Sequence, residues 1–221
     1  MRVGFIGTGA MGLPMAANIL DSGNKLSVFD IKESSTRPLI EKGAVHCSNI
    51  ESLSKQSEIV MMSLPGPEEV RVVAGQALAS MSVGKVLVDL STNSPSMIRE
   101  IDSMAKSKKV SFLDAPVSGG TRGAKNGELT VMVGGERETF EELHSIWNCI
   151  GTNVFYIGGV GTGNIVKLVN NMLAFSNMMS NAEALVLGAK AGIDPSVLWR
   201  VVKTSSGNST TWTGGVKAIL K

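Results

Sequence analysis

Short apolar runs alternate with segments of helical length through residues 1–160. Short connections join the two kinds of segment, and this alternation favours a parallel sheet covered by helices on both faces. The sequence therefore predicts an α/β fold with a doubly wound parallel sheet over residues 1–163. The expected strands are Val3–Ile6, Leu26–Phe29, Ile59–Ser63, Val86–Leu90, Ser111–Asp114, Leu129–Val133 and Val154–Tyr156.

The pattern changes at the glycine-rich segment Gly158–Gly163, which is followed by one long helical pattern. Apolar residues recur at steps of three or four in this segment, as on one face of a helix. We expect a second, all-helical domain over residues 164–221, with an apolar stripe for burial made by Leu168, Met172, Phe175, Met179, Ala182 and Val186. The remaining chain is expected to cover this stripe only in part, so either the stripe docks on a partner subunit or the polypeptide is shorter than the fold it belongs to.

Later signals divide this helical region. Gly192 can end the long helix, and Asp194-Pro195 can begin another that runs to about Lys203. Residues 204–215 are rich in Ser, Thr, Gly and Asn and predict a loop. Residues 215–221 read as a helix that only begins, so we expect the helical domain to be incomplete and, if completed, to support a homo-oligomer.

The first strand leads into a glycine-rich turn, GTGAMG, and then into a helix-like segment. The first glycine permits the turn, the second allows a pyrophosphate to approach the backbone, and the third lets helix pack on strand. An acid 23 residues after Gly7 stands where a carboxylate accepts hydrogen bonds from an adenosine ribose. This Rossmann-type arrangement predicts bound NAD, held by Gly7, Gly9, Ala10, Met11, Gly12 and Asp30.

Several predicted strands end in small or polar residues. In doubly wound sheets the ligand lies outside the carboxyl ends of the strands. These termini are therefore expected walls of one cleft, although each alone could be an ordinary turn: Gly7, Asp30, Leu64-Pro65-Gly66, Ser91-Thr92-Asn93 and Ala115-Pro116.

Two further features could carry chemistry. Lys167 and Asn171 lie four residues apart near the start of the long helix, so they share a face. The helix dipole and burial would lower the pKa of the lysine and suit it to general acid/base work; a surface lysine is the plainer alternative. Ser118-Gly119-Gly120 could direct backbone N–H groups at a substrate carboxylate, or form a simple turn that Asp114 caps.

Other function classes find little support in the composition. A net charge of +2 with scattered basic residues gives no case for nucleic acid. The two cysteines and two histidines are isolated, so we expect no metal site and no disulfide. We expect no membrane span and no targeting segment, hence a cytoplasmic protein, or a mitochondrial matrix protein if a presequence has been removed.

Three segments resemble the β-hydroxyacid dehydrogenase family, most closely its members that act on 3-hydroxyisobutyrate. They are GFIGTGAMGLPMAANIL, DAPVSGGTRGAKNGELTVMVGG, and GGVGTGNIVKLVNNM followed by EALVLGAKAGID. Asn170 stands where 6-phosphogluconate dehydrogenases carry a histidine, which argues against a phosphosugar substrate. The family also continues beyond this chain, with a KDLG-type motif that has no counterpart here.

The resemblance implies a role for each matching residue. Lys167 would be the general acid/base, and Asn171 would position the substrate. Its carboxylate would be held by Ser118, Gly119 and Gly120, and Trp212 would form a pocket wall. Leu64, Pro65, Ser91 and Thr92 would line the cofactor side.

The implied reaction is hydride transfer from a small 3-hydroxy acid to NAD, which yields a semialdehyde, as in valine catabolism. One alternative is an NADPH-dependent reductase of small aldehydes such as glyoxylate or succinic semialdehyde, although Asp30 would repel a 2′-phosphate. The other alternative is a truncated, non-catalytic protein that binds NAD.

Overall fold

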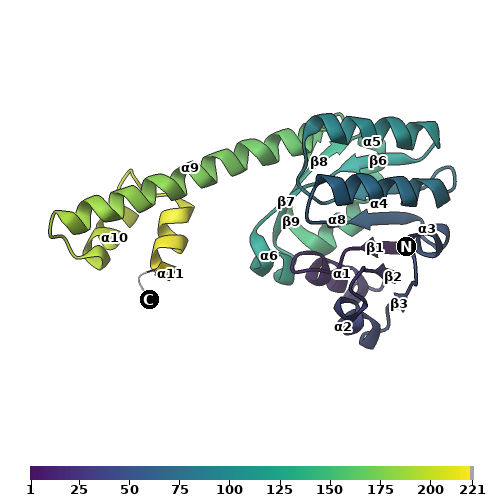
Figure 1. Ribbon diagram of the computed structural model, residues 1–221, viewed down its shortest axis with the longest axis horizontal. Coiled ribbons are helices and arrows are strands. Elements are labelled where there is room, and N and C mark those ends of the chain that lie inside the picture. The colour runs from purple at the N-terminus through teal and green to yellow at the C-terminus, as the bar shows by residue number, and fades with distance from the viewer. Residues whose placement is uncertain (220–221) are drawn as a thin grey trace. The chain divides into compact units, whose positions relative to one another are not determined.

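The computed structural model describes residues 1–219, in which nine strands form one sheet with helices packed against it (Figure 1). The spatial order of the strands is β3-β2-β1-β4-β5-β6-β8-β7, with β9 also paired to β8. The strands are β1 (Arg2–Ile6), β2 (Lys25–Phe29), β3 (Val45–His46), β4 (Ile59–Met62), β5 (Val86–Asp89), β6 (Ser111–Asp114), β7 (Val117–Ser118), β8 (Leu129–Gly135) and β9 (Gly151–Gly158).

Pairing is parallel from β3 through to β6 and between β8 and β9, and antiparallel where β8 meets β6 and β7. The predicted doubly wound, mostly parallel sheet is therefore confirmed. Two short strands, β3 and β7, were not expected, because two residues are too few to show an alternating pattern.

Helices bury both faces of the sheet, so the central strands carry apolar residues on both sides. Val60 and Leu87 face one core, while their neighbours Met61 and Val88 face the other. The connecting helices of this α/β unit are α1 (Gly12–Asp21), α2 (Arg37–Glu41), α3 (Ile50–Gln56), α4 (Pro67–Ser80), α5 (Pro95–Ser107), α6 (Gly120–Asn126), α7 (Arg137–Glu142) and α8 (His144–Ile150), with the 3-10 turn η1 (Glu33–Ser35).

The chain packs as two units, Met1–Lys167 and Leu168–Lys221, and the division falls inside the long helix α9 (Thr162–Lys190). The second, helical unit continues with α10 (Pro195–Lys203), the π-helix η2 (Thr211–Val216) and α11 (Lys217–Ile219). The sequence predicts that the last helix begins at Gly215. Residues 220 and 221 of that predicted segment lie outside the described part of the chain.

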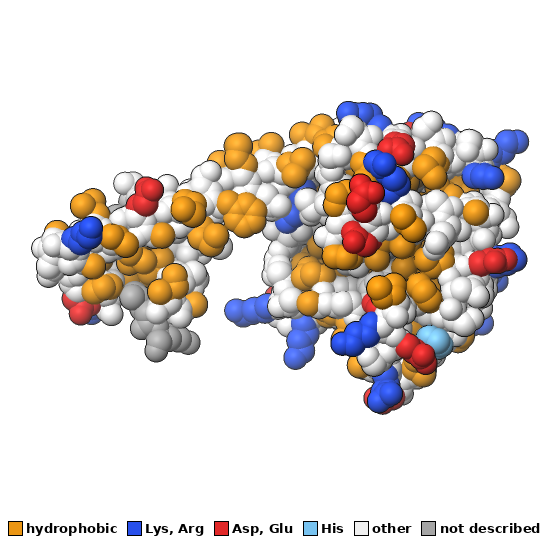
Figure 2. All heavy atoms as spheres, viewed as in Figure 1, with side chains coloured by type: hydrophobic (Ala, Val, Ile, Leu, Met, Phe, Trp, Pro, Cys, Tyr) orange, Lys and Arg blue, Asp and Glu red, His pale blue; other side chains and the backbone are white. Residues whose placement is uncertain are grey.

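The apolar stripe of α9 is only partly covered within this chain, as expected, with Met172 at 60% and Phe175 at 59% of their full exposure (Figure 2). Periodicity identified the face but not how much of it is buried. One expectation for the helical unit is wrong. The expected loop over residues 204–215 is instead helical from Thr210 onward. The side chain of Trp212 is buried there, and its backbone N–H donates to the Ser209 hydroxyl at 3.0 Å.

Strand register brings the carboxyl ends of the central strands to one edge of the sheet. Ile6 is level with Phe29 and Met62, and Asp89 is level with Met62 and Asp114. The residues that follow these strands, which are the predicted cleft walls, therefore lie along this edge (the carboxyl edge). No helix within residues 1–219 combines the length and the apolar character needed to cross a bilayer.

Candidate active site

The glycine-rich turn has the backbone geometry that the motif requires. Gly7 has φ +88°, a conformation that favours glycine, and a Cβ at Gly12 would collide with the carbonyl oxygen of Gly7. A Cβ at Gly9 would meet no atom within 4 Å, so the backbone there is open to a ligand. Helix α1 begins without a side-chain cap and without an acid in its first turn, which leaves N–H groups available to phosphate.

Asp30 directly follows β2 and holds this turn by hydrogen bonds. One carboxylate oxygen accepts hydrogen bonds from the Thr8 N–H at 2.7 Å and the Thr8 hydroxyl at 3.3 Å, and the other accepts from the Lys32 N–H at 2.8 Å. The side chain is half-buried, and the oxygen that accepts from Lys32 has a second lone pair with which to accept another hydrogen bond. These features fit an adenosine ribose, and the turn and Asp30 together form a fitting site for a dinucleotide.

The ends of β4 and β5 are tied together beside this turn. The Leu64 N–H donates to the Ser91 hydroxyl at 2.9 Å, and the Ser91 N–H donates to Asp89 at 3.0 Å. Thr92 and Pro65 are exposed at the same edge of the sheet. Four predicted cofactor residues are thus brought together on two neighbouring loops, and their role toward the cofactor stays a prediction.

Ser118, Gly119 and Gly120 span the end of β7 and the start of α6. The two glycines have φ +133° and +62°, so the backbone there needs residues without a Cβ. Both glycines are exposed and Ser118 is half-buried. The segment is accessible to a ligand, and its binding of a substrate carboxylate stays a prediction.

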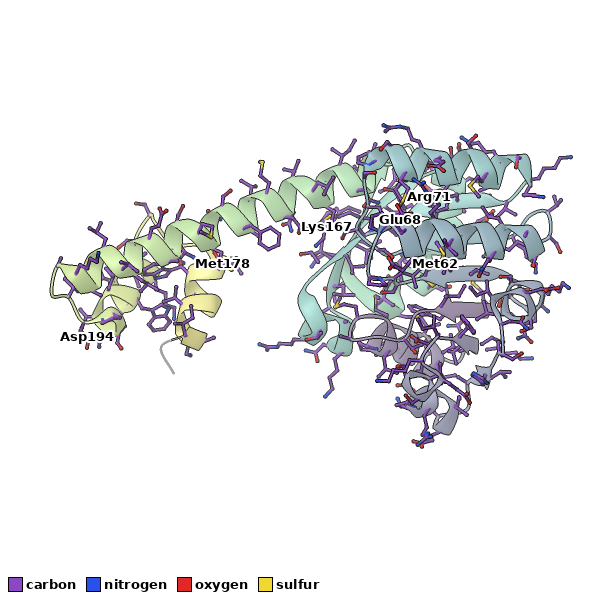
Figure 3. The ribbon with its side chains drawn as sticks, in the orientation of Figure 1. Met62, Glu68, Arg71, Lys167, Met178 and Asp194 are labelled. Carbon is purple, nitrogen blue, oxygen red and sulfur yellow. The ribbon has the colours of Figure 1, made fainter. Side chains whose placement is uncertain are left out.

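Lys167 lies in the α/β unit and projects from α9 (Figure 3). The side chain is half-buried, and this burial lowers the pKa of its ammonium group, with no charged partner contributing. Asn171 follows one turn later on the same helix and is also half-buried. A lysine with a lowered pKa is suited to accept a proton, as the sequence predicts.

The sequence did not predict a buried polar network under the start of α9. Asp114 does not cap its own loop: it accepts from the Gly161 N–H at 2.7 Å and from the Asn164 N–H at 2.9 Å. Asp89, level with it on the next strand, accepts from the Asn93 amide at 2.7 Å. The only signal in the sequence was an aspartate at the end of each strand.

Burial governs both acids of this network. It raises the pKa of Asp114, against the opposing effect of the N–H groups of Gly161 and Asn164. It raises the pKa of Asp89 to about 6, and the neighbouring charge of Asp114 adds to the rise. Within residues 1–219 no group of His, Cys, Asp and Glu side chains could hold a metal ion.

Trp212 is only 1% exposed and lies within the helical unit. Its indole N–H donates to the Trp199 carbonyl at 3.2 Å, and the Trp199 indole donates back to the Trp212 carbonyl at 3.2 Å. The ring therefore packs inside its own unit. Its predicted part in a substrate pocket has no counterpart among these contacts and stays a prediction.

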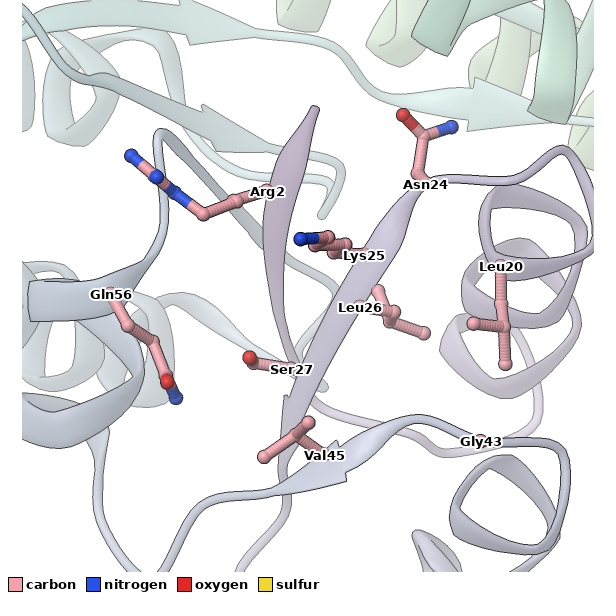
Figure 4. A pocket seen from close by; sticks show the side chains of 9 residues that line it. All are labelled: Arg2, Leu20, Asn24, Lys25, Leu26, Ser27, Gly43, Val45 and Gln56. Atoms are coloured by element: carbon pink, nitrogen blue, oxygen red, sulfur yellow. The ribbon is translucent and has the colours of Figure 1, made fainter.

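A hollow of about 320 Å³ lies where β1 and β2 begin, at the amino edge of the sheet (Figure 4). None of the predicted site residues lines it. Arg2, one of its basic residues, pairs with Glu58 at 3.2 Å. The lining residues are Arg2, Leu20, Asn24, Lys25, Leu26, Ser27, Gly43, Val45 and Gln56.

Comparison with known proteins agrees with this geometry. Residues 2–158 match the family described as the NAD binding domain of 6-phosphogluconate dehydrogenase. Residues 161–221 match the family described as the NAD-binding part of NADP-dependent 3-hydroxyisobutyrate dehydrogenase. Together the two matches cover nearly the whole chain.

Three relatives illustrate the similarity. The 2-(hydroxymethyl)glutarate dehydrogenase of Eubacterium barkeri is 41% identical over 95% of this chain and 70% of its own length. The 3-hydroxyisobutyrate dehydrogenase of Pseudomonas aeruginosa is 39% identical over 94% of this chain and 70% of its own. The Mycobacterium tuberculosis 3-hydroxyisobutyrate dehydrogenase, solved with L-serine, superposes with a TM-score of 0.90 at 30% identity, over 97% of this chain and 74% of that one.

Proposed function

Since this chain belongs to the β-hydroxyacid dehydrogenase family and is a nicotinamide-dependent hydroxyacid dehydrogenase, we propose that it oxidises a small 3-hydroxy acid of the 3-hydroxyisobutyrate type with NAD. The observation that carries the proposal is the half-buried Lys167, whose pKa is lowered without any charged partner. Bound NAD would supply the hydride acceptor. The product would be a semialdehyde.

In this proposal each residue acts on a named group. The neutral amine of Lys167 takes the proton of the substrate hydroxyl while the adjacent carbon loses its hydride. Asn171 orients the hydroxyl from the next turn of α9, and the N–H groups around Ser118–Gly120 hold the carboxylate. Burial assists Lys167 because it keeps the amine uncharged at a lower pH.

The decisive experiment is Lys167→Ala, with Lys190→Ala as the matched control at the exposed end of the same helix. Loss of a positioned base should lower kcat by about a hundred- to ten-thousandfold, and the control should keep full activity. NAD reduction with 3-hydroxyisobutyrate measures turnover, and calorimetry should give the same NAD affinity for all three proteins. Near-normal turnover in Lys167→Ala would contradict the mechanism.

Choice of NAD over NADP rests in this proposal on Asp30, whose carboxylate would repel a 2′-phosphate. An NADPH-dependent reductase of small aldehydes is the second candidate, because the family matched by residues 161–221 is described as NADP-dependent. Asp30→Ser should lower NAD affinity about ten- to a hundredfold, while Asp21→Ser, an exposed acid on α1, should not. Tighter binding of NADPH than NADH by the unaltered chain would favour the second candidate.

A further inference from the structure

Four buried side chains link the loop after β5 to the start of α9. Asp89, Asp114 and Asn164 are 0% exposed and Asn93 is 4% exposed. All four lie within the α/β unit. The Asn93 amide donates to Asp89, the Asn93 backbone N–H donates to the side-chain oxygen of Asn164, and the Asn164 amide donates to Asp114. Each of the four residues makes at least one hydrogen bond in this network, and such bonds help to fix a single geometry. Within the described residues the side-chain oxygen of Asn93 has no hydrogen-bond partner.

Asn164 is the central link because its side-chain amide both accepts and donates a hydrogen bond. The side-chain oxygen accepts from the Asn93 backbone N–H at 2.7 Å, and the side-chain NH2 group donates to an oxygen of Asp114 at 3.1 Å. An aspartate would lack the donor and would place a third carboxyl beside two buried ones. A leucine of similar size would lack both groups, and would leave the Asn93 N–H without this partner.

The start of α9 has little freedom to move away from this link. Asp114 also accepts from the Gly161 and Asn164 N–H groups, which satisfies donors at the helix N-terminus. A Cβ at Gly163 would collide with the carbonyl oxygen of Met132, so the helix lies directly against β8. The first turn of α9 is thus held by hydrogen bonds and by close packing together.

We propose that Asn164 is a positioning residue that sets Lys167, one turn further along α9, relative to the loop that carries Ser91 and Thr92. The inference rests on the proposed function, in which Lys167 is the base and that loop lines the cofactor. The network reaches the loop twice, through Asn93 and through Asp89, which accepts the Ser91 N–H at 3.0 Å. The base and the cofactor side would then share one rigid support.

The test compares Asn164→Ala with Asn177→Ala, which removes an exposed amide from the same helix. In Asn164→Ala, kcat for oxidation of 3-hydroxyisobutyrate should fall about a hundredfold, while the KM for NAD changes little, because a displaced base slows chemistry. Asn164→Ser keeps one small group that donates and accepts, and it should recover part of the loss. The control should match the unaltered protein.

A second readout does not require turnover. Reductive methylation with a carbon-13 label allows the pKa of Lys167 to be followed by NMR, with Lys167→Arg identifying its signal. Asn164→Ala should raise this pKa toward the ordinary lysine value, as the helix start loosens and water reaches the amine. If Lys167→Ala kept normal turnover, the proposed function would fail. A raised Lys167 pKa in Asn164→Ala would still support the positioning role of Asn164.

The proposal is overturned if Asn164→Ala lowers the melting temperature while the kcat of the folded protein and the pKa of Lys167 stay unchanged. Asn164 would then only stabilise the fold. Should Asn164→Ala fail to fold, the same two measurements on Asn164→Ser decide in its place. An unchanged kcat and pKa in that variant overturn the proposal as well.

Discussion

The α/β unit and the helical unit bury their side chains to different extents. In residues 1–167, apolar side chains fill two cores, one on each face of the sheet, and every buried polar side chain of the described residues lies there. In residues 168–219, only Gly188, Trp212 and Val216 are buried, and α9 exposes a row of large apolar residues. The first unit therefore contains its own stabilising contacts, whereas the second leaves an apolar face without a cover in this chain.

The largest expected difference comes from removing one aromatic side chain from each unit. Trp147 is 0% exposed and its indole donates to the Phe140 carbonyl at 2.9 Å, so Trp147→Ala should cost about 3–5 kcal/mol of unfolding free energy. Phe175→Ala, on exposed α9, should change it by about 0.5 kcal/mol or less. Urea unfolding followed by circular dichroism measures both. A comparable loss in Phe175→Ala would mean that the stripe is covered in solution, as the predicted homo-oligomer would cover it.

The buried acid Asp89 should make the unfolding free energy of the α/β unit depend on pH. Because the pKa of Asp89 is raised from 3.8 to about 6, the folded state holds a proton that the unfolded state releases between these values. The unfolding free energy should therefore fall as the pH rises through this window, by about 3 kcal/mol in full. Asp89→Asn should remove that fall, so the variant gains stability relative to the unaltered chain between pH 4 and 7.

A matched control for Asp89 is Glu51→Gln on the exposed surface. A hydrogen bond from Lys55 and the positive charge of Lys55 lower the pKa of Glu51, so this acid adds stability that is lost as the pH falls. Its removal should change the pH slope in the opposite direction to Asp89→Asn. Parallel pH profiles for Asp89→Asn and the unaltered chain would show that Asp89 stays ionised in the fold.

One substitution, glycine to alanine, tests how tightly each unit is packed. At Gly12 the added methyl would collide with the backbone carbonyl of Gly7, so we expect a cost of about 1–3 kcal/mol and loss of NAD binding. At Gly188 it would meet the end of the Leu198 side chain, which can rotate, and alanine favours the helix by about 1 kcal/mol. Thermal unfolding should show a nearly unchanged midpoint for Gly188→Ala. An equal loss of stability in Gly12→Ala and Gly188→Ala would contradict the expectation that the α/β unit is the more tightly packed of the two.

The smallest effect concerns a helix cap in the helical unit. Asp194 accepts from the Ser196 N–H at 2.7 Å and the Val197 N–H at 3.1 Å, so Asp194→Ala should cost about 1 kcal/mol. Hydrogen exchange should locate this loss in α10 and leave the strands of the sheet protected. Asn49→Ala, which removes the cap of α3, should instead act within the α/β unit. Loss of protection in the sheet of Asp194→Ala would show that the two units unfold together.

Several features followed from the sequence because they depend on near neighbours. The central strands and the glycine turn are local patterns, in which side-chain alternation and the absence of a Cβ decide the backbone. The placement of Lys167 and Asn171 on one helical face follows from their spacing alone. Family resemblance added the roles of these residues, which the proposed experiments test.

Other features needed the tertiary structure. Asp114 caps a helix that begins 48 residues later in the chain, and this pairing depends on where β6 ends against the start of α9. Whether the apolar stripe of α9 is covered depends on what packs against it, and periodicity records only that the face is apolar. Local patterns in the sequence therefore predicted the longer strands, the long helix and the dinucleotide turn. The register of the strands and the packing of α9 decided which distant polar groups meet, because no local pattern encodes a hydrogen bond between remote segments.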